Sequence, residues 1–134
     1  MNILNQKPPI YDKAKAAFGD LSGMVFCYGD VIYFPDGKEP KLPADVIVHE
    51  AVHSAQQEEL GPMGWWKKYL NDPEFRFRQE LQAYQEQYQY CCAIVKDRNE
   101  RARIAHRLAA DLSGPAYGRI VDGVKALTLI KEKP

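Results

Sequence analysis

Residues 45–60 read DVIVHEAVHSAQQEEL and predict a helix that carries a metal-binding motif. His49 and His53 are four positions apart, so both imidazoles lie on the same helical face and reach one metal ion. Glu50 follows the first histidine, where its carboxylate reaches a water molecule on that metal. The pattern H-E-x-x-H therefore predicts two zinc ligands and a general base on one helix.

A catalytic zinc site normally has three protein ligands, so a third must come from elsewhere in the chain. The candidates are downstream carboxylates and His106. Glu80 is the strongest, because it borders the apolar seam of a long helix, where a carboxylate is costly to desolvate without a cation. The alternative is an ordinary ion pair between Glu80 and Arg76, one turn earlier.

The remaining pattern predicts an α+β, mostly helical protein with a single domain over residues 1–134. Residues 24–28 and 31–34 are β-branched and aromatic runs separated by Gly29-Asp30, which predicts a tight hairpin. Residues 1–10 are expected to form a poorly ordered or docked arm, because Pro8-Pro9 resists helix formation. The helix that carries the motif is expected over residues 45–60, with Asp45 as its N-cap and Gly61-Pro62 as its stop signal. A short aromatic helix with Trp65 and Trp66 follows, and a long helix capped by Asp72 begins at Pro73. The other expected helices cover residues 11–18, 101–112 and 121–130.

Composition argues against several classes of partner. The 18 basic and 18 acidic residues give zero formal net charge, so nucleic acid and acidic membrane surfaces are not expected as partners. The arginines of residues 98–107 are interrupted by acids and are interpreted as a solvated helix face. No apolar run is long enough to span a bilayer, and three cysteines suit a reducing compartment. Cys91 and Cys92 are expected to pack as small apolar residues, with soft metal ligation as the alternative.

A family resemblance joins these residues. The HExxH run, followed by a helix with Glu80-Leu81-Gln82-Ala83-Tyr84, resembles the gluzincin branch of zinc metallopeptidases. More narrowly, residues 65–84 and 112–118 are similar to small metallopeptidase-like proteins of bacteriophages and prophages, a resemblance that covers about residues 24–130. It implies a minimal zincin-like domain, with the hairpin packed against the HExxH helix, working in the cytoplasm of a bacterial host cell.

The resemblance also implies roles for the motif residues and for the hairpin strand, and the proposed mechanism leaves further roles to fill. Zinc would be the cofactor, with His49, His53 and Glu80 as ligands and Glu50 as the general base. The sequence departs from the larger gluzincins at position 84, where many of them have an aspartate that orients a ligand histidine. Here the hydroxyl of Tyr84 would take that role, and a core aromatic is an equal or better interpretation. The mechanism also needs a donor to the oxyanion besides zinc. Tyr117, in a Gly-Pro-Ala-Tyr-Gly turn, is the first candidate and His106 the second, and a structural tyrosine is the alternative for Tyr117. The strand of residues 31–34 would be the edge strand over the cleft, with Val31 and Tyr33 pairing to an extended substrate.

Three functions remain open from the sequence. The preferred one is a zinc-dependent peptidase that hydrolyses a peptide bond in an intracellular protein, with a peptide or protein substrate as its partner. The second is a catalytically inactive, zinc-stabilised module that binds another protein, such as a host factor, and has no need of Glu50. The third is a helical domain that holds no metal.

Overall fold

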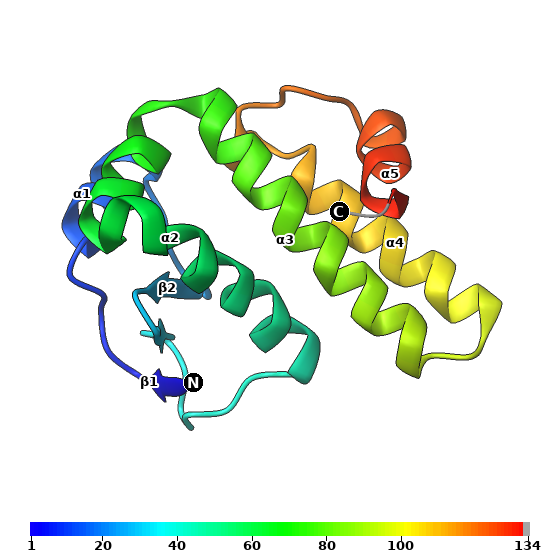
Figure 1. The fold of residues 1–134 in the computed structure, drawn as a ribbon, viewed down its shortest axis with the longest axis horizontal. Helices are drawn as coiled ribbons and strands as arrows, with labels where there is room; N and C mark the ends of the chain where they lie inside the picture. Colours follow the sequence, from blue (N-terminus) through cyan, green and yellow to red (C-terminus); the bar gives the residue numbers. More distant parts are fainter. Residues whose placement is uncertain (133–134) are drawn as a thin grey trace. The chain divides into compact units, whose positions relative to one another are not determined.

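The computed structural model describes residues 1–132 and shows a mostly helical α+β protein (Figure 1). The described chain forms two compact units, unit 1 from Met1 to Asp72 and unit 2 from Pro73 onward. The sequence predicts one domain over residues 1–134, and that assignment stays a prediction. Residues 133–134 lie outside the described residues. The elements in chain order are β1 (Asn2–Leu4), α1 (Tyr11–Phe18), β2 (Phe26–Tyr28), β3 (Val31–Tyr33), α2 (Ala44–Asn71), α3 (Pro73–Ile94), α4 (Arg98–Leu112), the 3-10 turn η1 (Pro115–Tyr117) and α5 (Gly123–Lys131).

The predicted hairpin is confirmed in unit 1. Strands β2 and β3 are antiparallel, with Tyr28 opposite Val31 across the Gly29-Asp30 turn. Gly29 has a φ of 64°, and Asp30 does not share the positive φ. This combination is typical of a type II′ turn, which needs glycine at its first central position.

The N-terminal arm contains a strand that the sequence did not predict. Asn2–Leu4 forms β1, which pairs in parallel with β3, so the sheet order is β1-β3-β2. The docked alternative for residues 1–10 is thus the correct one for this segment. The edge position predicted for β3 is wrong, because β1 and β2 occupy both of its sides. Val31 and Tyr33 therefore have no open edge to offer an extended substrate.

Helix α2 differs from the prediction at its start and near its middle. It begins at Ala44 with Pro43 as the N-cap residue, so the N-cap predicted at Asp45 is wrong by position, and Asp45 lies in the first turn. Gly61 has φ 73° and ψ 162°, values that interrupt the helix. The Gly61-Pro62 stop signal therefore takes the form of a kink, after which the helix resumes to Asn71. The kink brings Pro62 against Gly29, since a Cβ built on Gly29 meets Pro62 Cγ at 3.6 Å.

Aromatic side chains after the kink form much of the core of unit 1. Trp65 is 1% exposed and stacks on Tyr69 with ring centroids 4.9 Å apart. Trp66 contacts Phe26 of β2 and is also buried. Both tryptophans thus pack the core of this unit. Helix α1 matches its predicted bounds and ends at Gly19, whose φ is 81°.

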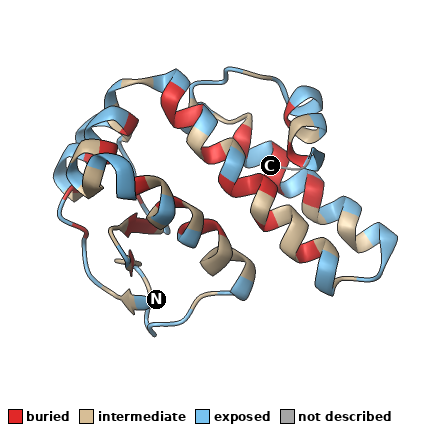
Figure 2. Cartoon of the chain, viewed as in Figure 1, coloured by how far each residue is buried: buried red, intermediate tan, exposed pale blue. Residues whose placement is uncertain are grey.

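Unit 2 is built from three helices that pack on one another. Helix α3 begins at Pro73 as predicted, α4 is capped by the Asp97 side chain, and α5 by that of Asp122. Buried residues recur along α3, where the predicted seam contributes Phe77 and Tyr84 to the core (Figure 2). The other core residues are Leu108, Ala109, Leu112, Ala126 and Ile130.

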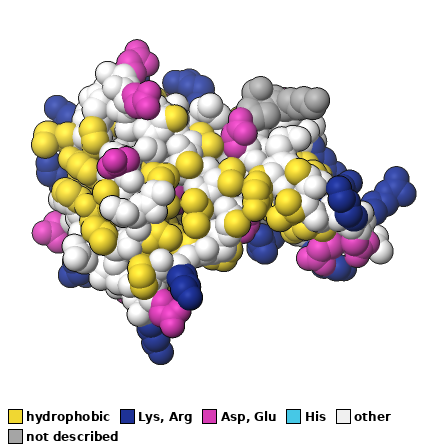
Figure 3. Space-filling view, turned by 60° about the horizontal axis from the view of Figure 1, so that its bottom comes forward, with side chains coloured by type: hydrophobic (Ala, Val, Ile, Leu, Met, Phe, Trp, Pro, Cys, Tyr) yellow, Lys and Arg dark blue, Asp and Glu magenta, His cyan; other side chains and the backbone are white. Residues whose placement is uncertain are grey.

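Charged side chains of both signs are interspersed on the face of the molecule displayed in Figure 3. On α4, Arg103 pairs with Glu100, and Arg101 donates to the carbonyl oxygen of Cys92 at 2.8 Å. These local pairings fit the interpretation of the arginine run as a solvated face. Among the described residues, no helix combines the length and the apolar character that a membrane span requires.

Candidate metal centre

The two motif histidines face each other on the buried side of α2. His49 and His53 are 8% and 4% exposed, and their Nε2 atoms are 3.2 Å apart. Two nitrogens bound to one tetrahedral zinc ion lie about 3.3 Å apart, given Zn–N bonds of about 2.0–2.1 Å. The helix therefore places both nitrogens at the spacing that a shared metal ion needs. A hydrogen bond between the two rings is the metal-free alternative for the same distance.

Gln56 fixes the orientation of His53, one of the candidate ligands, and was not singled out by the sequence. His53 Nδ1 lies 2.8 Å from Gln56 Oε1. Because an amide oxygen only accepts, Nδ1 carries the proton and the lone pair of His53 lies on Nε2. The signal for this residue was its spacing, since Gln56 is three positions after His53 and hence on the same side of the helix.

Glu80 joins the histidines as the third member of a group able to hold a metal ion. The ligand atoms of His49, His53 and Glu80 lie within 4.8 Å of one another, and all three side chains are buried. Two imidazoles and one carboxylate match the donor set of catalytic zinc sites, which leave one position open. Arg76 is also buried, at 7% exposed, so pairing with Glu80 stays the competing explanation for that carboxylate.

Glu50 is the buried carboxylate next to the first ligand. It is 6% exposed, and its Oε2 lies 3.8 Å from His49 Nε2. At this distance from His49, the Glu50 carboxylate is close enough to contact a water molecule bound to a metal ion at the candidate site. Its influence extends to Cys27, because burial first, and then the charges of Glu50 and Asp30, raise the pKa of the Cys27 thiol to about 12.

Helix α2 is held to the hairpin by a side-chain amide. Gln57 is 1% exposed, donates to the carbonyl oxygen of Cys27 at 2.8 Å and accepts from the Gly29 amide at 2.7 Å. Cys27 faces Ile32 in a position of the antiparallel ladder that leaves its carbonyl on the outer side of β2. Trp66 Nε1 donates to the same carbonyl at 2.9 Å. The outer edge of β2 is therefore occupied by side chains of α2.

The two predicted tyrosines meet within unit 2. The Tyr84 and Tyr117 hydroxyls are 3.4 Å apart, with Tyr84 on α3 one turn after Glu80 and Tyr117 at the end of η1. Tyr84 is 7% exposed and Tyr117 is half-buried. Both also pack on the core cluster of the unit, as the structural alternative predicts. Either hydroxyl can donate to the other, so the pair leaves one proton for a further acceptor.

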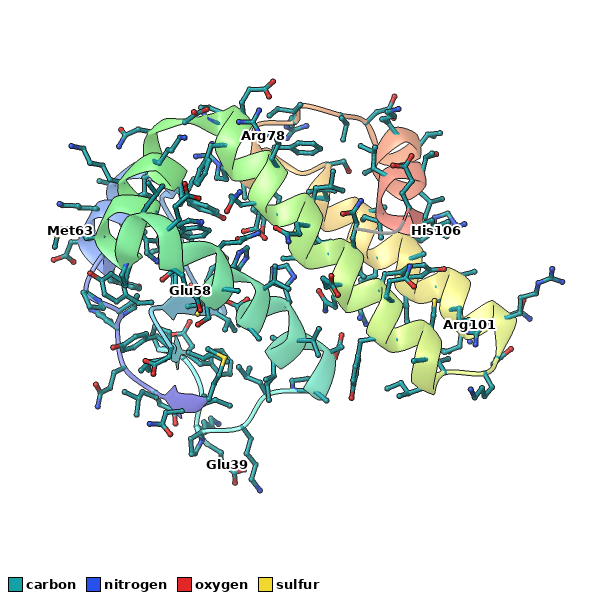
Figure 4. All side chains as sticks on the ribbon, in the orientation of Figure 1. Glu39, Glu58, Met63, Arg78, Arg101 and His106 are labelled. Atoms are coloured by element: carbon teal, nitrogen blue, oxygen red, sulfur yellow. The ribbon has the colours of Figure 1, made fainter. Side chains whose placement is uncertain are left out.

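The other candidates lie outside the group. His106 is exposed on α4 and does not belong to the His49–His53–Glu80 group (Figure 4). Cys91 is buried and Cys92 half-buried, and neither belongs to the His49–His53–Glu80 group. Trp65 lies beside the centre, with its ring centroid 5.3 Å from that of His53. It therefore forms an apolar wall for one ligand.

No protein-family model, curated protein or solved structure matches this chain. A function for this chain is therefore inferred from the arrangement of its side chains.

Proposed function

We propose that this protein is a zinc-dependent peptidase of gluzincin type, with His49, His53 and Glu80 as the metal ligands. The observation that carries the proposal is the buried group formed by these three residues, whose ligand atoms lie within 4.8 Å of one another. The Nδ1 proton of His53, held by Gln56, supports it further because it leaves Nε2 as the donor to the metal.

In the proposed hydrolysis, zinc and the residue Glu50 have different roles. When bound, zinc supplies a Lewis acid that polarises the scissile carbonyl and makes water a better nucleophile. Glu50 receives a proton from the attacking water as its oxygen bonds to the carbonyl carbon. The same carboxylic acid then returns that proton to the leaving amine nitrogen as the C–N bond breaks. The burial of Glu50 keeps its carboxylate close to the reacting atoms and away from bulk water.

Tyr117 is the proposed donor to the oxyanion, and Tyr84 is the proposed positioning residue. Their 3.4 Å hydroxyl contact supports these roles, because a hydroxyl held by a neighbour reorganises less when charge develops. A peptide or protein is the proposed substrate. It has to bind without adding a strand to β3, whose two sides are occupied by β1 and β2. The three free cysteines support a reducing cytoplasm as the proposed compartment.

The test combines metal content with proteolysis. Natively purified wild-type protein should contain about one zinc per chain by plasma mass spectrometry. His49→Ala and Glu80→Ala should lose it. The zinc-loaded wild type should cleave members of a proteome-derived peptide library, whereas Glu50→Gln should retain zinc and lose cleavage. Absence of zinc from the wild type, with no thermal stabilisation on adding zinc, contradicts the proposal.

The same experiment separates the enzyme from the inactive zinc-stabilised module. A module predicts full zinc content, zinc-dependent stability and no cleavage by either the wild type or Glu50→Gln. The burial of Glu50 beside His49 favours the enzyme, because an inactive module gains nothing from a second buried carboxylate at that place.

A further inference from the structure

Unit 1 has an apolar groove between α1 and the part of α2 that follows the Gly61 kink. Its volume is about 680 Å³, which is within the usual range for pockets that hold small molecules. The lining residues are Ile10, Lys13, Ala16, Ala17, Met63, Lys67, Leu70 and Asn71. The metal ligands His49 and His53 lie before the kink, so the groove is separate from the candidate metal centre.

The walls of the groove are apolar and contain exposed hydrophobic surface. Met63 is 71% exposed and projects from the outer side of α2 (Figure 4). Ile10 is buried at 7% exposed and closes the groove from the start of α1, while Ala16 and Ala17 leave space because their side chains are small. Exposed apolar surface gathered in one concave place is typical of a binding site.

The charged residues that line the groove have a single sign. Lys13 and Lys67 are its only charged lining residues, and neither forms an ion pair within residues 1–132, although Asp72 lines the adjoining pocket with Lys67. Both are exposed, so their ammonium groups can reach a ligand at the mouth of the groove. An apolar floor with two uncompensated cations at the side fits a molecule that has an apolar body and an anionic end.

We propose that this groove binds a free small amphipathic carboxylate, with its apolar chain along Ile10, Ala17 and Met63 and its carboxylate at Lys13 and Lys67. The proposal stands on the groove alone and does not depend on the metal centre or on peptidase activity. The lining residues indicate this class of ligand. Burial of the ligand's apolar chain supplies most of the affinity, and the two lysines favour a negatively charged end group.

The test uses dodecanoate as the probe, with dodecanol and dodecyltrimethylammonium as matched chains of different charge. Each is titrated below its micelle-forming concentration into the full chain by calorimetry and by amide NMR. Dodecanoate should bind saturably, once per chain, and shift amides of residues 10–17 and 61–71. It should bind better than dodecanol, and dodecyltrimethylammonium should bind worst.

Variants separate the two contributions. Lys13→Glu/Lys67→Glu should weaken dodecanoate by about threefold or more, as expected for two exposed ion pairs, and should improve dodecyltrimethylammonium. Lys38→Glu/Lys41→Glu, the same charge change away from the groove, should leave both affinities unchanged. Met63→Ser should weaken all three probes, and its melting temperature should stay near that of the wild type because the side chain is exposed.

Three results overturn the proposal. The first is no saturable binding of dodecanoate, and the second is equal affinity for the three end groups. The third is binding confined to vesicles of anionic phospholipid, measured by co-sedimentation, which would assign the groove to a membrane surface instead of a free ligand.

Discussion

Replacement of Gln57 should loosen the attachment of the hairpin to helix α2. Gln57→Ala removes one donor to the Cys27 carbonyl and the acceptor of the Gly29 amide, at 2.8 and 2.7 Å. Each lost hydrogen bond costs about 0.5–1.5 kcal/mol, and the vacated volume adds to this because the side chain is 1% exposed. We expect unfolding to become easier by about 2–4 kcal/mol, a fall of about 6–12 °C in melting temperature for a chain of this size.

The second donor to the Cys27 carbonyl makes this prediction sharper. Trp66→Phe alone leaves that carbonyl bonded to Gln57, and Gln57→Ala alone leaves it bonded to Trp66. The double variant leaves a buried carbonyl without either donor, which costs about 1–3 kcal/mol beyond the sum of the single changes. Gln57→Met keeps most of the volume and isolates the hydrogen-bond contribution. Gln89→Ala on α3 is the control for loss of a glutamine from a helix.

Urea and thermal unfolding, followed by circular dichroism in the presence of a chelator, measure these free energies without a contribution from metal. If the losses in unfolding free energy of the Gln57 and Trp66 single variants add up to that of the double variant within about 0.5 kcal/mol, the two side chains do not share the Cys27 carbonyl as an acceptor. A Gln57→Met protein as stable as the wild type would show that packing alone, without hydrogen bonding, retains the hairpin.

Three further predictions concern the metal centre and its neighbour Cys27. Gln56→Ala should weaken zinc binding by about 10–100-fold in a competition titration with a chromogenic chelator, while Gln56→Glu, which keeps an acceptor for His53 Nδ1, should not. Glu50→Gln should lower the cleavage rate by about 10²-fold or more at unchanged zinc content, and an unchanged rate would remove Glu50 from the mechanism. The raised pKa of Cys27, about 12, means that its thiol ionises in the unfolded chain before it does so in the folded one. Its contribution to stability is thus complete below about pH 9 and falls by about 1.4 kcal/mol per pH unit from there toward pH 12, a slope that Cys27→Ala should lack in pH-dependent unfolding.

The sequence predicted the elements whose signals are local. The hairpin turn, the start of α3 at Pro73 and the end of α1 at Gly19 each depend on backbone preferences of a few neighbouring residues. Strand β1 has no such signal, because a three-residue strand becomes stable only through its parallel pairing with β3, about 29 positions away in sequence. The edge position of β3 was wrong for the same reason, since one unpredicted strand covers it.

The candidate site shows the same division. The spacing of His49 and His53 determines their shared face, and the cost of desolvating a carboxylate pointed to Glu80. The contacts of Gln56 and Gln57 were missed, because glutamine on a helix is ordinary and only the folded chain shows which amide meets a histidine and which meets a hairpin. The hydroxyl contact of Tyr84 with Tyr117 likewise depends on the path of the chain from α4 to α5.

The burial of Glu80 distinguishes a metal ligand from an ion-pair partner of Arg76. If Glu80 binds zinc, Glu80→Gln should abolish the stabilisation by zinc, which reaches about 4 kcal/mol at a thousandfold excess over the dissociation constant. The same change should leave the metal-free protein as stable or more stable, because it neutralises a carboxylate that is 4% exposed. If Glu80 instead serves Arg76, the metal-free variant should lose about 3 kcal/mol or more, because a buried cation would be left without its partner. Unfolding with and without zinc therefore assigns this carboxylate before any substrate is known.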